Sequence, residues 1–556
     1  MKCFLRITAL ILTIVFFVTA LTYCTDGKSI DDKNNGDVTK TNYIDISNYV
    51  IVRPDMANVY LIKAVSEFKK DILAYTGKDI KVVTDSEEPS TYEIVIGSTN
   101  RSDSQNAINT LKGKTSKEAF IIEIKNEKIL IGGLSDVDTF SAMKYFINEF
   151  AKLSNKNGSL LLREQNGVLI KKTGDHIYTT DDFHTVILED TLTVAKPEDI
   201  LDEEEFAYPK VIKLENQENE KDNGTLLVVN ENTKGEKWAI YRSVDDGKTW
   251  ETLNRIPDNI NTKLKKGYQA YIYELPADVG EYKKGTILFA GCSYGNTDTK
   301  IYLAASRDLG TTWESVCNVD EGGGFNQNRW LSEGLWEPVL IYENGRLYCM
   351  YSDERDNGAG NNHVGGHNQK LVYRYTTDLK TWSDVGEMMA SDTPNLRPGM
   401  ISITKMGNGK WALVYEMDVE SGLQIHIKFA DSLDSWDVAD NGKPVKTIQG
   451  NGIGSAPTIV WTPAGGECGT LFVVAQRNTK KSTSETKCDL FMSFDYGETF
   501  VSVKNPIPVT ENEHVRCGRS AGFYVDKQGT VYYVNNPLWK SNSFGAVLSL
   551  VKIKVY

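Results

Sequence analysis

The larger, C-terminal part of the chain is built from short hydrophobic runs separated by polar turns that contain glycine. One unit recurs: an apolar strand, a turn, a second apolar strand ending in polar residues, a third strand, and a turn with aspartate and an aromatic residue. Each of the six copies spans about 55–70 residues, a spacing typical of repeat architectures. Such units close into a ring, so the pattern predicts an all-β six-bladed β-propeller over residues 180–556. The first strands begin at Tyr208, Ala270, Trp336, Arg397, Ser455 and Arg519.

The sixth copy lacks the turn that ends the other units and stops at the strand VLSLVKIKVY. Its outer strand must therefore come from elsewhere. The apolar segment HTVILED at 184–190 lies just before the first copy. We expect this segment to complete the sixth blade and so to join the two ends of the ring.

Three of the turns share the pattern Ser-x-Asp-x-Gly-x-Thr followed by Trp or Phe, at residues 243–250, 306–313 and 493–500. Aspartate accepts hydrogen bonds from turn N–H groups, glycine adopts positive φ, and the aromatic ring packs beside the next strand. The turns resemble the Asp boxes (BNR repeats) of sialidase-like propellers. That resemblance implies a structural role and assigns them no catalysis.

Residues 43–172 have a different pattern, in which strands and helices alternate. An amphipathic helix is predicted from Ala57 to Gly77, a hairpin across Asn126 and Glu127, and a last helix from Val137 to Leu153. The pattern indicates a small α/β domain. It resembles the N-terminal domain that precedes the catalytic domains of α-glucuronidases and β-hexosaminidases, which implies an accessory role.

The first 24 residues have the pattern of a targeting segment. Lys2 and Arg6 precede an apolar run at 7–21 that is too short for a comfortable membrane span, and Cys24 follows it. Residues 25–42 are a polar tether. This arrangement resembles a bacterial lipoprotein signal, so we expect export and a lipid anchor on the cell surface or in the periplasm; simple secretion is the alternative.

Composition narrows the class of partner. The net charge of −13 argues against nucleic acid, whose phosphates need a basic surface. Neither metal-like cysteine spacing nor a phosphate-binding glycine loop is present, so we expect no metal and no cofactor. Cys349 lies inside a predicted strand and is expected to be a buried free thiol, whereas other cysteines of an exported protein could form disulfides. The oligomeric state stays open.

The candidate chemistry lies where strands meet at one end of the ring. In an antiparallel pair the start of the first strand lies beside the end of the second, so these positions share one face in every blade. Glu337 and Glu416 lie there, each inside an apolar strand (WEPV and LVYEM). Glycoside hydrolysis uses two carboxyl groups, and burial beside Trp336 would raise the pKa of an acid, as a general acid requires. The alternative is that both glutamates merely pair with Arg355 and Arg397.

The segments WEPVLIYENGRLYCMYSDERD, HNQKLVYRYTTDLKTW and RPGMISITKMGNGKWALVYEMD resemble the catalytic domain of glycoside hydrolase family 93, the exo-α-1,5-L-arabinanases. The resemblance implies a retaining enzyme for α-L-arabinofuranosidic linkages, with Glu337 as acid/base and Glu416 as nucleophile. Lys210 stands where that family usually has arginine, which bears on substrate choice. The expected substrate-binding residues are Tyr208, Lys210, Trp336, Asp353, Arg355, His367, Gln369, Arg397, Arg477 and Arg519.

Two other functions fit the same fold. An exo-α-sialidase grips the substrate carboxylate with three arginines, for which Arg397, Arg477 and Arg519 are candidates. Its expected Phe-Arg-Ile-Pro motif is absent from the first blade, where Tyr208 and Lys210 flank a proline. A propeller that binds glycans without cleaving them is the second alternative, because a fold does not determine a function.

Overall fold

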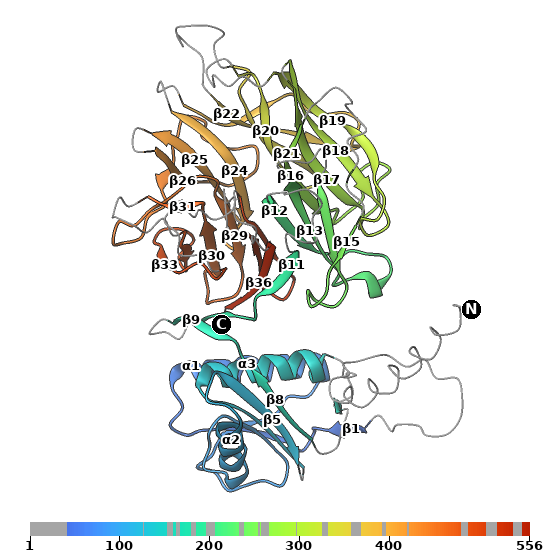
Figure 1. The fold of residues 1–556 in the computed structure, drawn as a ribbon. Coiled ribbons are helices and arrows are strands. Elements are labelled where there is room, and N and C mark those ends of the chain that lie inside the picture. Colours follow the sequence, from blue (N-terminus) through green and yellow to red (C-terminus); the bar gives the residue numbers. More distant parts are fainter. Residues whose placement is uncertain are drawn as a thin grey trace, which may run out of the picture.

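The computed structural model contains an α/β domain and a β-propeller (Figure 1). The predicted signal peptide and most of the tether, residues 1–41, lie outside the described residues. Within the described part, no helix is both long and apolar enough to span a bilayer. The structure describes residues 42–125, 127–152, 159–162, 167–179, 185–195, 206–232, 238–253, 256, 266–295, 297–324, 332–356, 369–391, 396–419, 422–479, 488–507, 520–536 and 548–555.

The α/β domain has a six-stranded mixed sheet in the order β3-β2-β4-β6-β5-β8. The strands are β2 (Val50–Arg53), β3 (Val82–Thr84), β4 (Glu93–Ile96), β5 (Ala119–Lys125), β6 (Lys128–Gly133) and β8 (Gly167–Lys172). A separate pair is formed by β1 (Asn42–Asp45) and β7 (Ser159–Leu162). The helices are α1 (Val59–Thr76), α2 (Ser102–Lys114) and α3 (Asp136–Phe146), which continues as the π-helical turn η1 (Ile147–Ala151).

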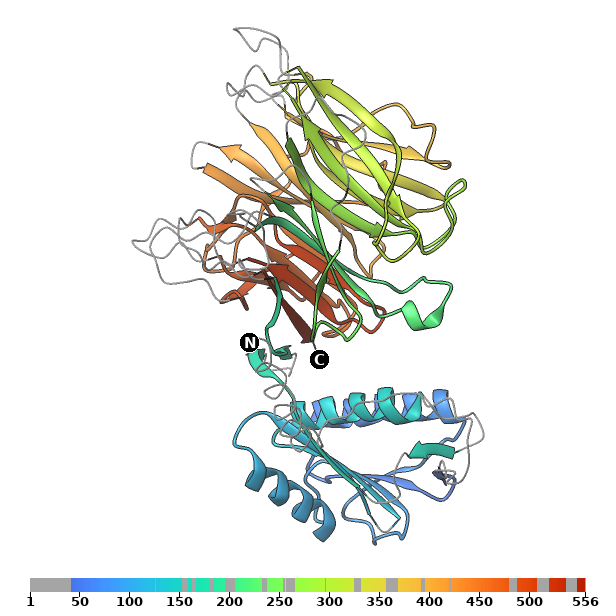
Figure 2. The ribbon, with the colours of Figure 1, turned by 45° about the vertical axis from the view of Figure 1, so that its right-hand side comes forward.

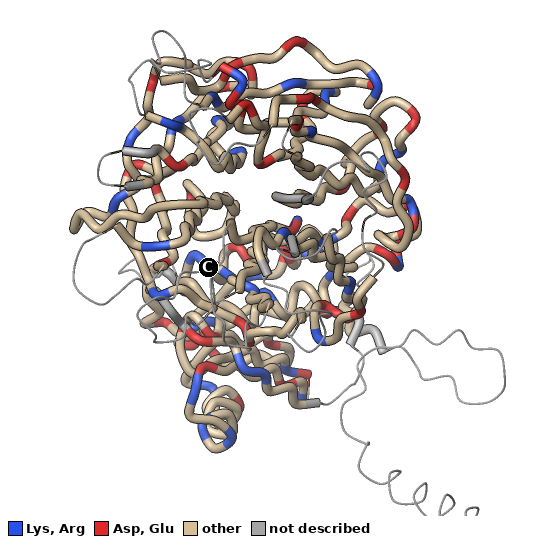
Figure 3. Tube along the Cα trace, turned by 45° about the horizontal axis from the view of Figure 1, so that its top comes forward, with Lys and Arg blue, Asp and Glu red and all other residues tan. Residues whose placement is uncertain are grey.

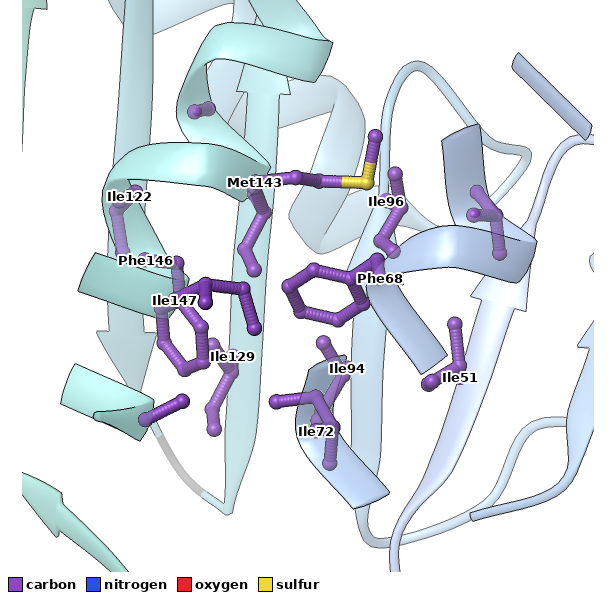
Figure 4. Packing of buried hydrophobic residues seen from close by; sticks show 14 of the residues in the cluster. Ile51, Phe68, Ile72, Ile94, Ile96, Ile122, Ile129, Met143, Phe146 and Ile147 are labelled. Atoms are coloured by element: carbon purple, nitrogen blue, oxygen red, sulfur yellow. The ribbon is translucent and has the colours of Figure 1, made fainter. Parts of the chain in front are cut away.

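Helix α1 shows why the helical prediction for this domain is confirmed. Its first turn is capped by the Asn58 side chain, which accepts a hydrogen bond from the N–H of Leu61. Gly77 ends it in the left-handed conformation with φ 76°. Its apolar face packs on α3 and on the sheet, and the rings of Phe68 and Phe146 lie 5.9 Å apart (Figure 4).

The propeller has six antiparallel sheets arranged in a ring (Figure 3), which confirms the predicted six-bladed propeller. Blade one is β12 (Phe206–Lys213), β13 (Leu226–Asn232), β14 (Ala239–Ser243) and β15 (Glu251–Thr252); blade two is β16 (Lys266–Glu274), β17 (Ile287–Tyr294), β18 (Asp298–Ser306) and β19 (Glu314–Gly323). Blade three is β20 (Leu335–Glu343), β21 (Arg346–Asp353), β22 (Lys370–Thr376) and β23 (Gly386–Ala390); blade four is β24 (Arg397–Lys405), β25 (Trp411–Val419) and β26 (Gly422–Ala430), extended by β27 (Lys443–Pro444), β28 (Ile453–Gly454) and β31 (Arg477–Asn478). Blade five is β29 (Thr458–Thr462), β30 (Thr470–Val474), β32 (Leu490–Ser493) and β33 (Val501–Val503).

Blade six closes the ring with strands from both ends of the propeller. It consists of β34 (Gly522–Val525), β35 (Val531–Asn535) and β36 (Leu548–Val555), followed by β10 (Thr185–Leu188) and β9 (Asp175–Thr179). A further strand, β11 (Leu192–Ala195), also pairs with β36. Strand β10 is antiparallel to β36, with Val186 opposite Val555. The predicted closing strand at 184–190 is therefore confirmed, and the sheet begins as early as Asp175.

The aspartate turns are held together as their sequence predicts. In the second copy, the Asp308 carboxylate accepts hydrogen bonds from the N–H and hydroxyl groups of Thr312, at 2.8 and 2.6 Å. Gly310 has φ 83°, and its carbonyl accepts from the Trp313 indole at 3.0 Å. Equivalent bonds recur at Asp245 and Asp495. Each turn therefore fixes the outer end of its blade locally.

Every blade has a non-glycine residue with positive φ near the start of its innermost strand, and in blade five a second one, Ser455 (φ 67°), comes just before it. In blades one to four the strand register shifts at this point, so the residue lies in a β-bulge. A bulge leaves one N–H outside the ladder and re-aims the local side chain. The six residues are Tyr208 (φ 49°), Gln269 (56°), Glu337 (61°), Met400 (57°), Ala456 (48°) and Ser520 (51°).

Candidate active site

The predicted face of the propeller is formed as expected. Leu335, at the start of β20, lies opposite Asp353, at the end of β21, and Arg397 lies opposite Asp418 in blade four. The hairpin turns at 463–468 and 527–530 join first strands to second strands at the other end. They face the α/β domain, which lies below the propeller in Figures 1 and 2. Residues of both parts line a cavity of about 1580 Å³. The α/β domain therefore lies at the end of the propeller opposite the predicted site.

Glu337 occupies the bulge of β20 and contacts residues of three blades. Its Oε1 accepts a hydrogen bond from Gln269 Nε2 at 3.0 Å. Its Oε2 accepts from the Ser352 hydroxyl at 2.6 Å and from the backbone N–H of Met400 at 3.1 Å. These donors come from blades two, three and four, so the carboxyl lies where neighbouring blades converge on the axis.

Glu416 lies in the second strand of blade four and is 7% exposed. It is opposite Gly399 in the β24–β25 ladder, next to the Met400 that binds Glu337. Its Oε2 accepts a hydrogen bond from the Ala456 N–H of blade five at 2.8 Å. The two glutamates thus make the same kind of contact: each carboxylate accepts the N–H of the positive-φ residue in the next blade.

The two carboxyls interact electrostatically. The pKa of Glu337 is raised to about 7. Burial is the largest cause and the negative charge of Glu416 adds to it, whereas the hydrogen bond from Ser352 and the charge of Arg397 act in the opposite direction. Arg397 interacts with both glutamates. A carboxyl with this pKa is protonated in about half of the molecules near neutral pH, as a general acid requires.

Arg397 is anchored by a third buried acid, Glu354, which is 2% exposed. The Arg397 guanidinium pairs with Glu354 Oε1. Glu354 Oε2 accepts hydrogen bonds from the Ser332 hydroxyl at 2.6 Å and from the Trp336 indole at 2.7 Å. The Trp336 ring packs edge-on to Tyr294 with centroids 5.6 Å apart. The predicted residues Trp336 and Arg397 are therefore held rigidly through one carboxylate.

Gln369 and Tyr208 also reach the axis. A Cβ on Gly399 would lie 2.7 Å from Nε2 of Gln369, so the amide lies against the residue opposite Glu416. Oε1 of the buried Gln369 has no hydrogen-bond partner within the part of the chain that the structure describes. The Tyr208 hydroxyl contacts Met400 Sδ at 3.9 Å, across from blade one to blade four.

Lys210 turns toward the sixth blade. Its ammonium donates hydrogen bonds to the carbonyl and hydroxyl of Ser520, both at 2.9 Å, and to the Ala521 carbonyl at 3.1 Å. These acceptors are uncharged, and burial lowers the pKa of Lys210 to about 7. In this position Lys210 connects blades one and six beside the axis.

Asp353 and Arg355 form a separate network. The Arg355 guanidinium contacts Asp353 at 2.7 Å and Asp320 of the outermost strand of blade two at 2.8 Å. Asp320 also accepts a hydrogen bond from the Tyr351 hydroxyl. Arg355 thus connects blades two and three. Among the described residues it forms ion pairs with these two aspartates and not with Glu337 or Glu416, so the alternative interpretation is wrong for Arg355. Its role in sugar binding stays a prediction.

The remaining predicted residues lie at the edge of the described structure. Arg477 is half-buried on β31, opposite Gly454, on the same face as the glutamates. His367 and Arg519 lie outside the described residues.

Three residues of the site were absent from the predicted set: Gln269, Ser352 and Glu354. Gln269 could have been found from the sequence, because it occupies the position equivalent to Tyr208, Glu337 and Met400 when the repeats are aligned. The first strand of blade two was predicted to begin one residue later, at Ala270, and this shift concealed Gln269. The proximity of Ser352 and Glu354 to Glu337 and Arg397 depends on side-chain direction, which the repeat does not specify.

Comparison with known proteins gives matches among solved structures. The chain is similar to the family 93 α-L-arabinofuranosidase of Fusarium graminearum in complex with arabinobiose, with 26% identity and a TM-score of 0.55 over 66% of this chain and 97% of that chain. It is also similar to the α-L-arabinanase of Penicillium chrysogenum complexed with arabinobiose, with 30% identity and a TM-score of 0.54 over 65% and 98% of the two chains. No protein-family model and no curated protein sequence matches the chain.

The propeller and its solved relatives define the class of the protein, which is a glycoside hydrolase. The matched region covers nearly the whole of each relative, so the likeness concerns the complete propeller rather than a shared strand motif. The chain belongs to glycoside hydrolase family 93. The alternatives of a sialidase and of a binding protein without activity are therefore set aside.

The raised pKa of Glu337 predicts a pH-dependent effect on stability. Its pKa is about 7 in the folded protein against 4.5 ordinarily, so stability is retained below about pH 4.5 and lost as the pH rises through 7. The shift corresponds to about 3 kcal/mol, which we reduce to about 2 kcal/mol because Glu337 is only partly buried. Glu337→Gln should therefore gain in melting temperature relative to wild type between pH 5 and pH 8. Glu343→Gln, at the other end of the same strand, where Glu343 pairs with Lys405, serves as the control. An equal gain in both variants would contradict the prediction.

Proposed function

We propose that the protein is an exported, exo-acting glycoside hydrolase that cleaves α-L-arabinofuranosidic linkages with retention of configuration, using Glu337 and Glu416. The observation that carries the proposal is the electrostatic coupling of these two carboxyls where blades three, four and five converge on the axis. The substrate class is supported by the names of the relatives, an arabinofuranosidase and an arabinanase that both hold arabinobiose.

In this mechanism Glu337 is the acid and base. Protonated Glu337 delivers its proton to the glycosidic oxygen while ionised Glu416 attacks the anomeric carbon, so the C–O bond breaks and a glycosyl ester forms. The ester removes the negative charge of Glu416, which lowers the pKa of Glu337. Glu337 then takes a proton from water, and the hydroxide oxygen displaces Glu416. Retention requires the two carboxyls to lie about 5–5.5 Å apart.

The sugar would be bound by the residues that surround this pair. Arg397, held by Glu354, and Gln369, whose amide oxygen has no partner among the described residues, are suited to hydroxyl groups, and Trp336 offers an apolar face. The full proposed set is Tyr208, Lys210, Trp336, Asp353, Arg355, His367, Gln369, Arg397, Arg477 and Arg519.

Export and lipid anchoring complete the proposal. The targeting pattern of residues 1–24, with Cys24 at its end, is its main support. Cys488 is in a disulfide, which suits an oxidising compartment. The free thiols include the buried Cys349, as its strand position predicted.

The test is a product analysis after incubation with debranched arabinan, arabinoxylan and sialyl-lactose. We expect arabinobiose as the single product from arabinan and no sialic acid from sialyl-lactose. A ladder of longer arabino-oligosaccharides would overturn exo action, and absence of any released sugar would overturn the proposed substrate class. Inversion of the first-formed anomer, measured by proton NMR, would overturn retention.

A further inference from the structure

We propose that Gln269 is the positioning residue for Glu337: it fixes the orientation of that carboxyl and leaves the acidic proton on Oε1. This inference rests on the proposed function for its chemical meaning. Gln269 belongs to blade two, is 9% exposed, and lies in the bulge of β16. It is therefore held by its own blade while its side chain contacts the first strand of blade three.

The hydrogen bonds define which way the amide points. The backbone N–H of Glu337 donates to Gln269 Oε1 at 2.9 Å. Because an N–H can only donate, the amide oxygen must lie on this side and the NH₂ group on the other. Gln269 Nε2 consequently donates to Glu337 Oε1 at 3.0 Å. The amide thus binds the backbone and the carboxyl of the same residue and cannot flip without losing both bonds.

The backbone of Glu337 explains why such a partner is needed. Its φ of 61° is costly for a residue with a side chain, and the bulge takes its N–H out of the strand ladder. Gln269 satisfies this N–H. The same relation occurs twice more around the axis, where Glu337 binds the Met400 N–H and Glu416 binds the Ala456 N–H. Gln269 is therefore the first member of a series of side chains that each bind the N–H of the positive-φ residue in the next blade.

The distribution of donors assigns the proton. A carboxyl oxygen has two lone pairs, and those of Glu337 Oε2 accept from Ser352 and from the Met400 N–H. Oε1 accepts from Gln269 and keeps a second lone pair. The proton that Glu337 gives to the leaving oxygen therefore resides on Oε1, beside the amide that holds it.

The chain offers a matched control in Gln217. Its Nε2 donates to Glu274 Oε1 at 2.7 Å, so a glutamine again binds a glutamate between blades one and two. Glu274 ends β16, at the end of the blade opposite Gln269. Replacing either glutamine with glutamate places two carboxyl groups side by side, where their negative charges repel each other. Only the change at position 269 involves Glu337.

The experiment compares Gln269→Glu, Gln269→Ala and Gln217→Glu with wild type. For Gln269→Glu we expect the basic limb of kcat/KM against pH to move up by about one unit, because a second negative charge beside Glu337 favours its protonated form. For Gln269→Ala we expect kcat to fall about 10- to 100-fold with KM changed less than threefold, since a misplaced acid affects the chemical step. Gln217→Glu should leave the basic limb in place.

An unchanged basic limb in folded Gln269→Glu, or an equal shift in Gln217→Glu, would overturn the inference. If Gln269→Glu does not fold, the kcat of Gln269→Ala decides, and a wild-type kcat would overturn it. If wild type cleaves no arabinan substrate, the proposed function fails instead. The inference is then decided by the Glu337-dependent change in melting temperature with pH, which Gln269→Glu should move to higher pH and Gln217→Glu should not.

Discussion

Glu416→Gln is expected to lower kcat on arabinobiose-releasing substrates at least about 10⁴-fold, because the proposed mechanism forms its covalent intermediate on the Glu416 carboxylate. Glutamine has the same shape, and its amide oxygen can still accept the Ala456 N–H that Glu416 binds at 2.8 Å. The fold should therefore survive, which circular dichroism and a melting curve would verify. The loss is measured as initial rates of arabinobiose release by chromatography.

Two substrates with different leaving groups distinguish the roles of the two glutamates. Glu337→Gln should lose about 10²–10⁴-fold on arabinan, where the departing oxygen needs a proton. It should recover most of its rate for glycosyl transfer on a dinitrophenyl arabinofuranoside, whose leaving group needs none. Glu416→Gln should be inactive on both substrates. The opposite outcome would exchange the two roles, and near-wild-type rates for both variants would remove both residues from the mechanism. Glu343→Gln, further along the strand of Glu337, is the control.

The fold was predictable because its signals are local and repeated. Strand alternation, turn glycines and the Ser-x-Asp-x-Gly-x-Thr turns each report on a few consecutive residues, and six copies reinforce one another. Even the long-range pairing of β10 with β36 could be predicted, since a propeller with a missing outer strand leaves one position for the apolar segment at 184–190. The α/β domain was equally predictable, because residues that end its helices, such as Gly77 after α1, are recognisable in the sequence.

Site residues were predictable from the sequence only where a charged side chain lies in an otherwise apolar strand. Glu337 and Glu416 are acids in apolar strands, and both lie at the axis. Gln269 is polar in a similar strand, but recognising it requires the position of the bulge, which depends on the register between β16 and β17. Arg355 shows the converse: it lies at the expected strand end, yet Asp320 of the adjacent blade binds it. Which blade borders which strand end is a property of the closed ring and not of one repeat.

The second large effect is expected at the closure of the ring. Val186 is fully buried in β10, opposite Val555 of β36, and it packs in the cluster between blades five and six. Val186→Asp would place a charge among apolar side chains and weaken the strand that joins the two ends of the propeller. The expected cost is about 3–5 kcal/mol, or roughly 10 °C in melting temperature for the propeller.

The matched control is Val168→Asp in β8 of the α/β domain, where the valine is 57% exposed and the same change should cost little. Differential scanning calorimetry of both variants would measure the difference. Since β10 is the fourth strand of blade six, after β34, β35 and β36, its loss leaves residues 553–555 of β36 without their outer neighbour. The propeller should then unfold earlier while the α/β transition stays in place. Equal melting temperatures for the two variants would mean that β10 adds nothing to closure. A fall in melting temperature confined to Val186→Asp would show that the segment with β9 and β10 stabilises the propeller. A fragment that begins at residue 206 should then be less stable than one that begins at Asp175.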